Sequence, residues 1–173
     1  MGTSPSAPRR TSTAGSRPTR GDVAAAPAGS RLTRSDVAAW LVKTSRPPEA
    51  IEPGWVPGET RTLQRCVRAT YRLGLMVPGQ VCLLWLSGQA SPGVHAVGTV
   101  APGPGGEEPV DTVDAPGGPV VTLTLRLLTE PVPRQELMAT AAFASAEVAR
   151  MPAGSNPSYL TAPQLAEVTA RLA

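Results

Sequence analysis

The sequence predicts an α+β fold, a small mixed β barrel with helices beside it, and three observations carry that prediction. Short apolar stretches with strand-like patterns fill the middle of the chain. Signals that start helices gather in its last third. The 20 prolines and 17 glycines, with only 3% aromatic residues, indicate many turns and loops. At 173 residues the chain is long enough for one domain and too short for two of ordinary size.

Residues 1–36 are predicted to be a disordered tail that precedes a domain spanning residues 37–173. Ser, Thr, Pro, Ala, Gly and Arg dominate the tail, and it lacks aromatic residues, so it cannot bury enough apolar surface to offset the entropy of ordering. A short repeat relates 19–25 to 33–39. Two explanations remain open: a harmless duplication or misplaced start, and a basic arm that contacts phosphates.

Positive charge is concentrated in the tail, because residues 1–34 hold six arginines and one aspartate. The remainder has ten basic and twelve acidic side chains, so the domain as a whole shows no bias toward nucleic acid. The chain has fifteen arginines and one lysine, which a GC-rich genome explains without any function.

The first half of the domain is predicted from its apolar runs. Residues 39–43 form a first strand, and 46–60, with four prolines, form an irregular loop. Arg61, Arg65, Arg68 and Arg72 would share one face if their segment is helical. Residues 81–100 read as two buried strands joined by a short polar turn, a β ribbon.

The second half begins with a loop at 102–119 and a long strand at 120–128. Pro133 opens a helix through Met138, with further helical turns toward residue 150, and 151–160 is a loop. Thr161 and Gln164 have the spacing of a capping box, which predicts the start of a last helix.

Residues for catalysis or for a metal are scarce, so the chain is expected not to be an enzyme and to hold no cofactor. The one histidine, His95, has no nucleophile motif beside it and is expected to be a structural or edge-strand residue. Cys82 is expected to be a buried free thiol, and the acidic loop with Asp111 and Asp114 to be solvated. Without a long apolar run or a signal peptide, the chain is expected to be cytoplasmic.

Residues suited to recognition are better represented. Trp40, Trp55 and Trp85 lie in or beside the first strands, and flat aromatic faces with nearby hydroxyl and amide groups suit a planar base. The alternative is that these aromatics form the core of an aromatic-poor domain. The arginine series would contact phosphate beside such a pocket, or would be only a solvated face.

The order of several motifs resembles EVE domains. The segment Trp40 to Thr44, followed by Pro47, is similar to the family's first strand. The passage from Val67 through Pro78-Gly79-Gln80 to Gly88, the stretch 92–98, and the segments at 133–137 and 151–161 follow in the family's order. The resemblance covers about residues 38–173.

This resemblance implies a PUA-like mixed β pseudobarrel of five to six strands flanked by helices, related to ASCH and YTH domains. It implies a pocket that takes a modified or flipped base of DNA or RNA, and a partner nucleic acid that carries such a base. The pocket candidates are Trp40, Lys43, Thr44, Trp55, Tyr71, Arg72, Trp85, Ser87, Ser155 and Asn156, and the phosphate contacts are Arg61, Arg65 and Arg68.

Two departures from the family's pattern bear on the pocket. Arg65 stands where the family often has a Trp, so Trp55 replaces that wall from its loop or the wall is missing. The family's usual Gly-Asp is Gly79-Gln80. The alternative function is a small-molecule sensor or a protein-interaction module that uses the same pocket, which an uncharged pocket mouth would favour.

Overall fold

The computed structural model describes residues 1–2, 31–88, 90–103, 110–111 and 118–172, and its compact unit is Leu32–Ala173. This unit begins five residues before the predicted boundary at residue 37, because the 3-10 helix η1 (Arg34–Asp36) belongs to it. Leu32 and Val37 pack against its core. The predicted disorder of the tail, the first copy of the repeat and most of the loop 102–119 lie outside the described residues.

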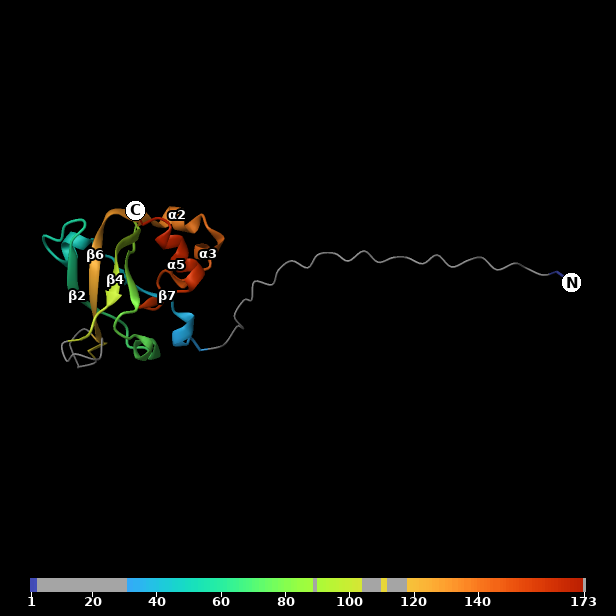
Figure 1. Ribbon diagram of the computed structural model, residues 1–173, viewed down its shortest axis with the longest axis horizontal. Coiled ribbons are helices and arrows are strands. Elements are labelled where there is room, and N and C mark those ends of the chain that lie inside the picture. The colour runs from blue at the N-terminus through green and yellow to red at the C-terminus, as the bar shows by residue number, and fades with distance from the viewer. Residues whose placement is uncertain (3–30, 89, 104–109, 112–117, 173) are drawn as a thin grey trace. The chain divides into compact units, whose positions relative to one another are not determined.

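The described residues form one mixed sheet of seven strands (Figure 1). Its order is β2-β6-β4-β3-β1-β7, with β5 paired to β6. Only β1 and β3 run parallel, and the other pairs are antiparallel. The strands are β1 (Ala39–Thr44), β2 (Thr60–Cys66), β3 (Val81–Leu86), β4 (Gly93–Val100), β5 (Val110–Asp111), β6 (Val120–Pro133) and β7 (Ser158–Leu160).

The predicted ribbon of residues 81–100 is the antiparallel pair β3 and β4 in the middle of the sheet. On its other side β4 pairs with β6. The two strands come so close at Gly98 that a Cβ there would lie 2.0 Å from the carbonyl oxygen of Thr124. Only glycine fits this crossing.

Three predictions about elements need correction. Of the arginine series, Arg61 and Arg65 lie on the strand β2, where their positions alternate with exposed residues and pair with β6, and Arg72 lies in a separate 3-10 helix, so the four share no helix face. The last residues of the predicted loop 151–160 form β7, which adds an antiparallel edge to β1. The loop 46–60 contains a short helix, α1 (Pro48–Ile51).

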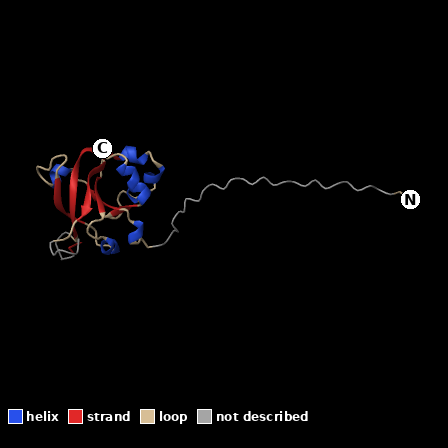
Figure 2. Ribbon diagram, viewed as in Figure 1, coloured by secondary structure: helices blue, strands red, loops and turns tan. Residues whose placement is uncertain are grey.

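Four helices of the C-terminal third lie together on one side of the sheet (Figures 1 and 2). They are α2 (Arg134–Met138), α3 (Ala141–Ala144), α4 (Glu147–Arg150) and α5 (Ala162–Thr169), and a 3-10 helix, η2 (Tyr71–Leu75), precedes β3. Pro133 precedes α2 as predicted, and the capping box of Thr161 and Gln164 starts α5. The predicted α+β class is confirmed. Among the described residues, no helix is long and apolar enough to span a membrane.

Two apolar cores lie on the two faces of this sheet. The interior core, enclosed by the curved sheet, includes Trp40, Val42 and Leu84. The helix-side core, between the sheet and the C-terminal helices, includes Leu41 and Leu83. Because successive strand residues point to opposite faces, β1 and β3 each supply side chains to both cores.

Candidate functional site

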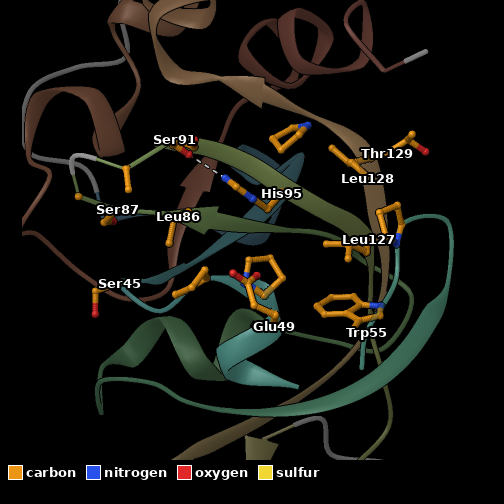
Figure 3. A pocket seen from close by; sticks show the side chains of 16 residues that line it. Ser45, Glu49, Trp55, Leu86, Ser87, Ser91, His95, Leu127, Leu128 and Thr129 are labelled. Atoms are coloured by element: carbon orange, nitrogen blue, oxygen red, sulfur yellow. Dashed lines mark hydrogen bonds between the residues drawn. The ribbon is translucent and has the colours of Figure 1, made fainter. Parts of the chain in front are cut away.

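A cavity of about 650 Å³ opens where β1 and β3 end (Figure 3). A volume of this size is typical of sites for small organic ligands. Its walls come from the segments after β1 and β3, the start of β4, the middle of β6 and the loop that carries α1. The lining residues are Ser45, Pro47, Pro48, Glu49, Trp55, Pro57, Leu86, Ser87, Gly88, Ala90, Ser91, His95, Leu127, Leu128, Thr129 and Pro131.

Trp55 forms the aromatic wall of the cavity (Figure 3). Its side chain belongs to the interior core and is only 4% exposed. The indole Nε1 donates a hydrogen bond of 3.0 Å to the backbone oxygen of Glu59, and the Trp55 amide donates to the oxygen of Glu52. The loop between α1 and β2 therefore supplies the aromatic side chain of the cavity wall.

Arg61 holds the Trp55 loop in place from strand β2. Its guanidinium donates to the carboxylate of Glu59 at 2.9 Å and to the backbone oxygen of Gly54 at 2.8 Å, and it lies 3.5 Å from the carboxylate of Glu52. The hydrogen bond from Arg61 lowers the pKa of Glu59, and the same bond raises the pKa of Arg61. This predicted phosphate contact is thus already engaged with two carboxylates.

The polar groups around the cavity are mainly hydroxyls. The amide of Ser87 donates to the backbone oxygen of Thr44 at 2.7 Å, which fixes Ser87 beside the end of β1. Ser45, Ser91 and Thr129 add further hydroxyls. Among the described residues that line the cavity, none is an arginine or a lysine.

His95 and Glu49 are the ionisable residues of the cavity wall. His95 lies on β4, which is an interior strand, so of the two expected alternatives, a structural and an edge-strand histidine, the edge position does not hold. Its Nε2 donates to the backbone oxygen of Ser91 at 2.8 Å (Figure 3). Because a carbonyl oxygen only accepts, this contact fixes Nε2 as the protonated nitrogen in the neutral ring.

Trp40 and Trp85 do not line the cavity with Trp55, contrary to the pocket implied by the resemblance. Trp40 is fully buried in the interior core, where its Nε1 donates to Oε1 of Gln80 at 2.7 Å. Trp85 packs in the helix-side core against Phe143, with ring centroids 6.0 Å apart. Both tryptophans are core residues, as the alternative interpretation had it.

Gln80 holds the turn before β3 through its side chain. Its side-chain oxygen accepts hydrogen bonds from the Trp40 indole and from the backbone amide of Val77 at 2.8 Å. An amide oxygen can accept two such bonds as well as a carboxylate oxygen can. The glutamine therefore anchors the turn before β3 to the interior core.

A second group of predicted pocket residues meets at the other side of β1. The Nζ of Lys43 donates to the backbone oxygens of Pro152 and Gly154 at 3.0 and 2.9 Å. The Asn156 side chain accepts from the amide of Lys43 at 2.9 Å and donates to its carbonyl at 3.2 Å, as a paired strand residue would. Burial lowers the pKa of Lys43. Ser155 lies half-buried in the same loop.

Arg72 and Tyr71 stabilise the domain at another place. Arg72 forms two hydrogen bonds of 2.7 Å with the carboxylate of Glu147 and lies over the ring of Tyr159 at 5.5 Å. Both ions of this pair are nearly buried. The hydroxyl of Tyr71 accepts a hydrogen bond from the amide of Leu32 at 3.3 Å. The contacts of Arg72 are structural.

The remaining predicted residues, Thr44, Arg65 and Arg68, lie where β2 approaches the end of β1. The Nη2 of Arg65 donates to Oγ1 of Thr44 at 3.4 Å. Arg68 is exposed, and its amide donates to the backbone oxygen of Asn156.

Metal ligands do not cluster in the described residues, where no three histidine, cysteine or acidic side chains come together. Burial raises the pKa of the Cys82 thiol to about 12, so this cysteine is the inert buried thiol that the sequence predicts. Cys66 is a free, exposed thiol.

Sequence reasoning found Trp55 and Ser87 and missed most of the cavity. Ser45 and Glu49 follow the predicted first strand directly, and a search for polar residues after strand ends would have found them. Residues 127–131 could not be recognised as cavity wall in this way, because their apolar composition is typical of any strand.

Comparisons with known proteins were made for sequence and for structure. No protein-family model matches the chain, and no curated protein matches it in sequence. A solved protein from Pseudomonas putida is 13% identical, with a TM-score of 0.54, over 77% of this chain and 98% of that one. A hypothetical protein from Leishmania major is 15% identical, with a TM-score of 0.50, over 79% of this chain and 95% of that one.

Human THYN1, solved in complex with DNA containing 5-methylcytosine, is 16% identical, with a TM-score of 0.49, over 76% of this chain and 95% of that one. The likenesses to the bacterial and the Leishmania proteins show a shared fold. The mixed sheet with its helices on one side is of the α+β class that the sequence predicts.

Proposed function

We propose that this chain is a cytoplasmic, non-catalytic binding module of EVE type that recognises a modified or flipped nucleobase of DNA or RNA in the cavity walled by Trp55. The observation that carries the proposal is the cavity itself. It joins one fixed aromatic side chain to hydroxyl groups, and two predicted pocket residues, Trp55 and Ser87, line it from different sides (Figure 3). A flat indole offers stacking to a base, and hydroxyls bind its edges.

The charge of the cavity wall is compatible with an uncharged group of the ligand, such as a base. Its charged member is Glu49, whose carboxylate accepts hydrogen bonds, while the hydroxyls of Ser45 and Ser87 can donate or accept them. A base with an exocyclic amino group, such as cytosine or adenine, can donate to the carboxylate. The phosphates of the nucleic acid would remain outside this cavity.

The test is binding of labelled oligonucleotides, single- and double-stranded, followed by fluorescence anisotropy. The oligonucleotides carry 5-methylcytosine, 5-hydroxymethylcytosine or N6-methyladenine and are compared with unmodified ones. We expect tighter binding of one modified oligonucleotide, and a loss of this preference in Ser87→Leu and Trp55→Leu. Stacking supplies about 1–3 kcal/mol per base, so the loss should be about tenfold.

The control is Val56→Ala, which changes the exposed neighbour of Trp55 and leaves the cavity wall intact. Ser87 follows β3 and is partly exposed, so Ser87→Leu fills the cavity without disturbing a core. Equal binding of all oligonucleotides by the wild type would refute the proposal. So would unchanged binding by Ser87→Leu and Trp55→Leu.

A second candidate function is the binding of a small uncharged molecule or of a protein segment in the same cavity. The described residues of its wall include no arginine or lysine, which favours this candidate. Salt separates the two, because nucleic acid binding weakens steeply as salt increases, and binding of an uncharged ligand does not.

A further inference from the structure

Arg65 differs in its surroundings from Arg61 and Arg72, whereas Arg68, which also forms no ion pair among the described residues, is exposed. Arg61 is paired with Glu52 and Glu59, and Arg72 is paired with Glu147. Arg65 forms no ion pair within the described part of the chain. Its positive charge is therefore uncompensated.

The geometry of β2 turns Arg65 inward. Leu63 is buried and the neighbours Gln64 and Cys66 are exposed, so the alternation places Arg65 on the inner face of the strand. Its Nη2 reaches Thr44 at 3.4 Å, while the buried Nε has no hydrogen-bond acceptor among the described residues. A buried N–H without a partner destabilises a protein, so its retention calls for an explanation.

A second arginine stands at the same place. The amide of Arg46 donates to Oγ1 of Thr44 at 3.0 Å, the same oxygen that Arg65 approaches, and the Arg46 side chain donates to the backbone oxygen of Ala50. Burial lowers the pKa of Arg65, and the charge of Arg46 lowers it further. Arginine stays protonated in proteins, so the two guanidinium groups repel each other, and neither forms an ion pair with a carboxylate among the described residues.

This pair of charges adjoins the cavity through one residue. Thr44 contacts both arginines, and the next residue, Ser45, lines the cavity. The backbone oxygen of Thr44 also accepts from the amide of Ser87, another lining residue. An anion at Arg65 and Arg46 would thus lie beside a ligand in the cavity.

We propose that Arg65 and Arg46 form a phosphate subsite at the edge of the cavity, so that the ligand is a nucleotide unit rather than a free base or nucleoside. This inference rests on the proposed function. The planar guanidinium of Arg65 offers Nε–H and an Nη–H side by side, which suits two oxygens of one phosphate. A phosphate there supplies the acceptor that Nε lacks.

The first experiment compares 5-methyl-2′-deoxycytidine with its 5′- and 3′-monophosphates by isothermal titration calorimetry. We expect one monophosphate to bind about tenfold tighter than the nucleoside, as a charge-assisted hydrogen bond predicts. Arg65→Gln should remove this advantage and leave nucleoside binding unchanged. The matched control is Arg126→Gln, which removes the same charge from an exposed position on β6. It should keep the advantage.

The second experiment separates this subsite from base recognition. Inorganic phosphate is titrated into the labelled protein, and the NMR signal of the Arg65 Nε–Hε group is followed. A shift of this signal supports the subsite even if no base binds, in which case only the proposed function fails. The subsite would be refuted if nucleosides bind as tightly as their monophosphates and the Arg65 signal does not shift with phosphate. The proposed function would then still stand.

A third variant guards against misfolding. Arg65→Lys keeps the charge and lacks the second donor, so we expect it to keep part of the phosphate advantage. Thermal unfolding of each variant establishes that it is folded. Full retention of the advantage in Arg65→Gln, measured on folded protein, would contradict the proposal.

Discussion

The side chains of Arg61 and Arg65 lie on the same face of β2, four residues apart, but their hydrogen-bond partners differ. The Arg61 guanidinium bonds two carboxylates and two backbone oxygens, and so fixes the loop of Trp55. The Arg65 guanidinium has one long hydrogen bond and a buried Nε without an acceptor among the described residues. Arg61 therefore stabilises the fold, whereas the buried donor of Arg65 destabilises it.

This contrast leads to a prediction on stability. Arg65→Met removes the buried donor and keeps an apolar side chain of similar length, so we expect the free energy of unfolding to rise by about 1 kcal/mol. The measurement is urea unfolding without ligand. Arg61→Met should lower stability instead, because it leaves Glu52 and Glu59 without their partner. A loss of stability in Arg65→Met would mean that its contacts are structural.

Glu147 provides a second prediction at this scale. Burial alone would raise the pKa of its carboxyl group, but hydrogen bonds from Arg72 and Ser158 outweigh burial and lower the pKa below the usual 4.5. Glu147→Gln leaves Arg72 buried with weaker acceptors, and we expect a loss of about 3 kcal/mol in chemical unfolding. Glu167→Gln, which breaks the more exposed pair with Arg171, should cost less than about 0.5 kcal/mol.

The effect of pH follows from the direction of this shift. A carboxyl group with a lowered pKa in the folded state contributes stability that is complete above its unfolded pKa of about 4.5. That contribution decreases as the pH falls below 4.5 through the folded value. The stability difference between the wild type and Glu147→Gln should therefore shrink on acidification. A difference that stays constant down to pH 2 would contradict this assignment.

At the scale of elements, β4 and β6 approach each other closely at two glycines. A Cβ atom added to Gly98 would lie 2.0 Å from the carbonyl oxygen of Thr124. One added to Gly93 would lie 2.1 Å from the carbonyl oxygen of Val132. Any side chain at these positions must push the two strands apart. Since both strands also form the cavity wall, their separation would change the cavity as well.

We therefore expect Gly98→Ala to lower the free energy of unfolding by about 2 kcal/mol or more, because overpacking a close backbone contact forces the strands to shift. The matched control is Gly74→Ala, whose added Cβ would meet no atom within 4 Å. That change should be nearly neutral in thermal unfolding. Equal Tm values for the two variants would show that β4 and β6 can separate freely.

For the molecule as a whole, the strands with apolar alternation were predictable and those without it were not. The interiors of β1, β3, β4 and β6 are apolar in the sequence. Strand β2 carries its inward positions as Arg61, Leu63 and Arg65, so its polar composition concealed a strand and its arginine spacing resembled a helix face. Strand β7 has three residues, too few for a pattern.

The site was predicted less completely than the fold, because its walls come from segments far apart in the sequence. Trp55 and Ser87 were found through composition and resemblance, whereas Glu49, His95 and Thr129 meet them only after folding. The alternation of a strand also decides which aromatic faces the interior core. Trp40 and Trp85 went to opposite faces, and the sequence gives no sign of which face borders a cavity.

The positions of the three tryptophans allow their fluorescence to report on different parts of the protein. Trp40 lies in the interior core, Trp55 in the cavity wall and Trp85 beside Phe143 in the helix-side core. Trp40 and Trp55 share the interior core, where only Trp55 borders the cavity, and Trp85 lies in the other core. Variants that keep a single tryptophan would give separate emission signals for ligand entry, for loosening of the interior core and for detachment of the helices.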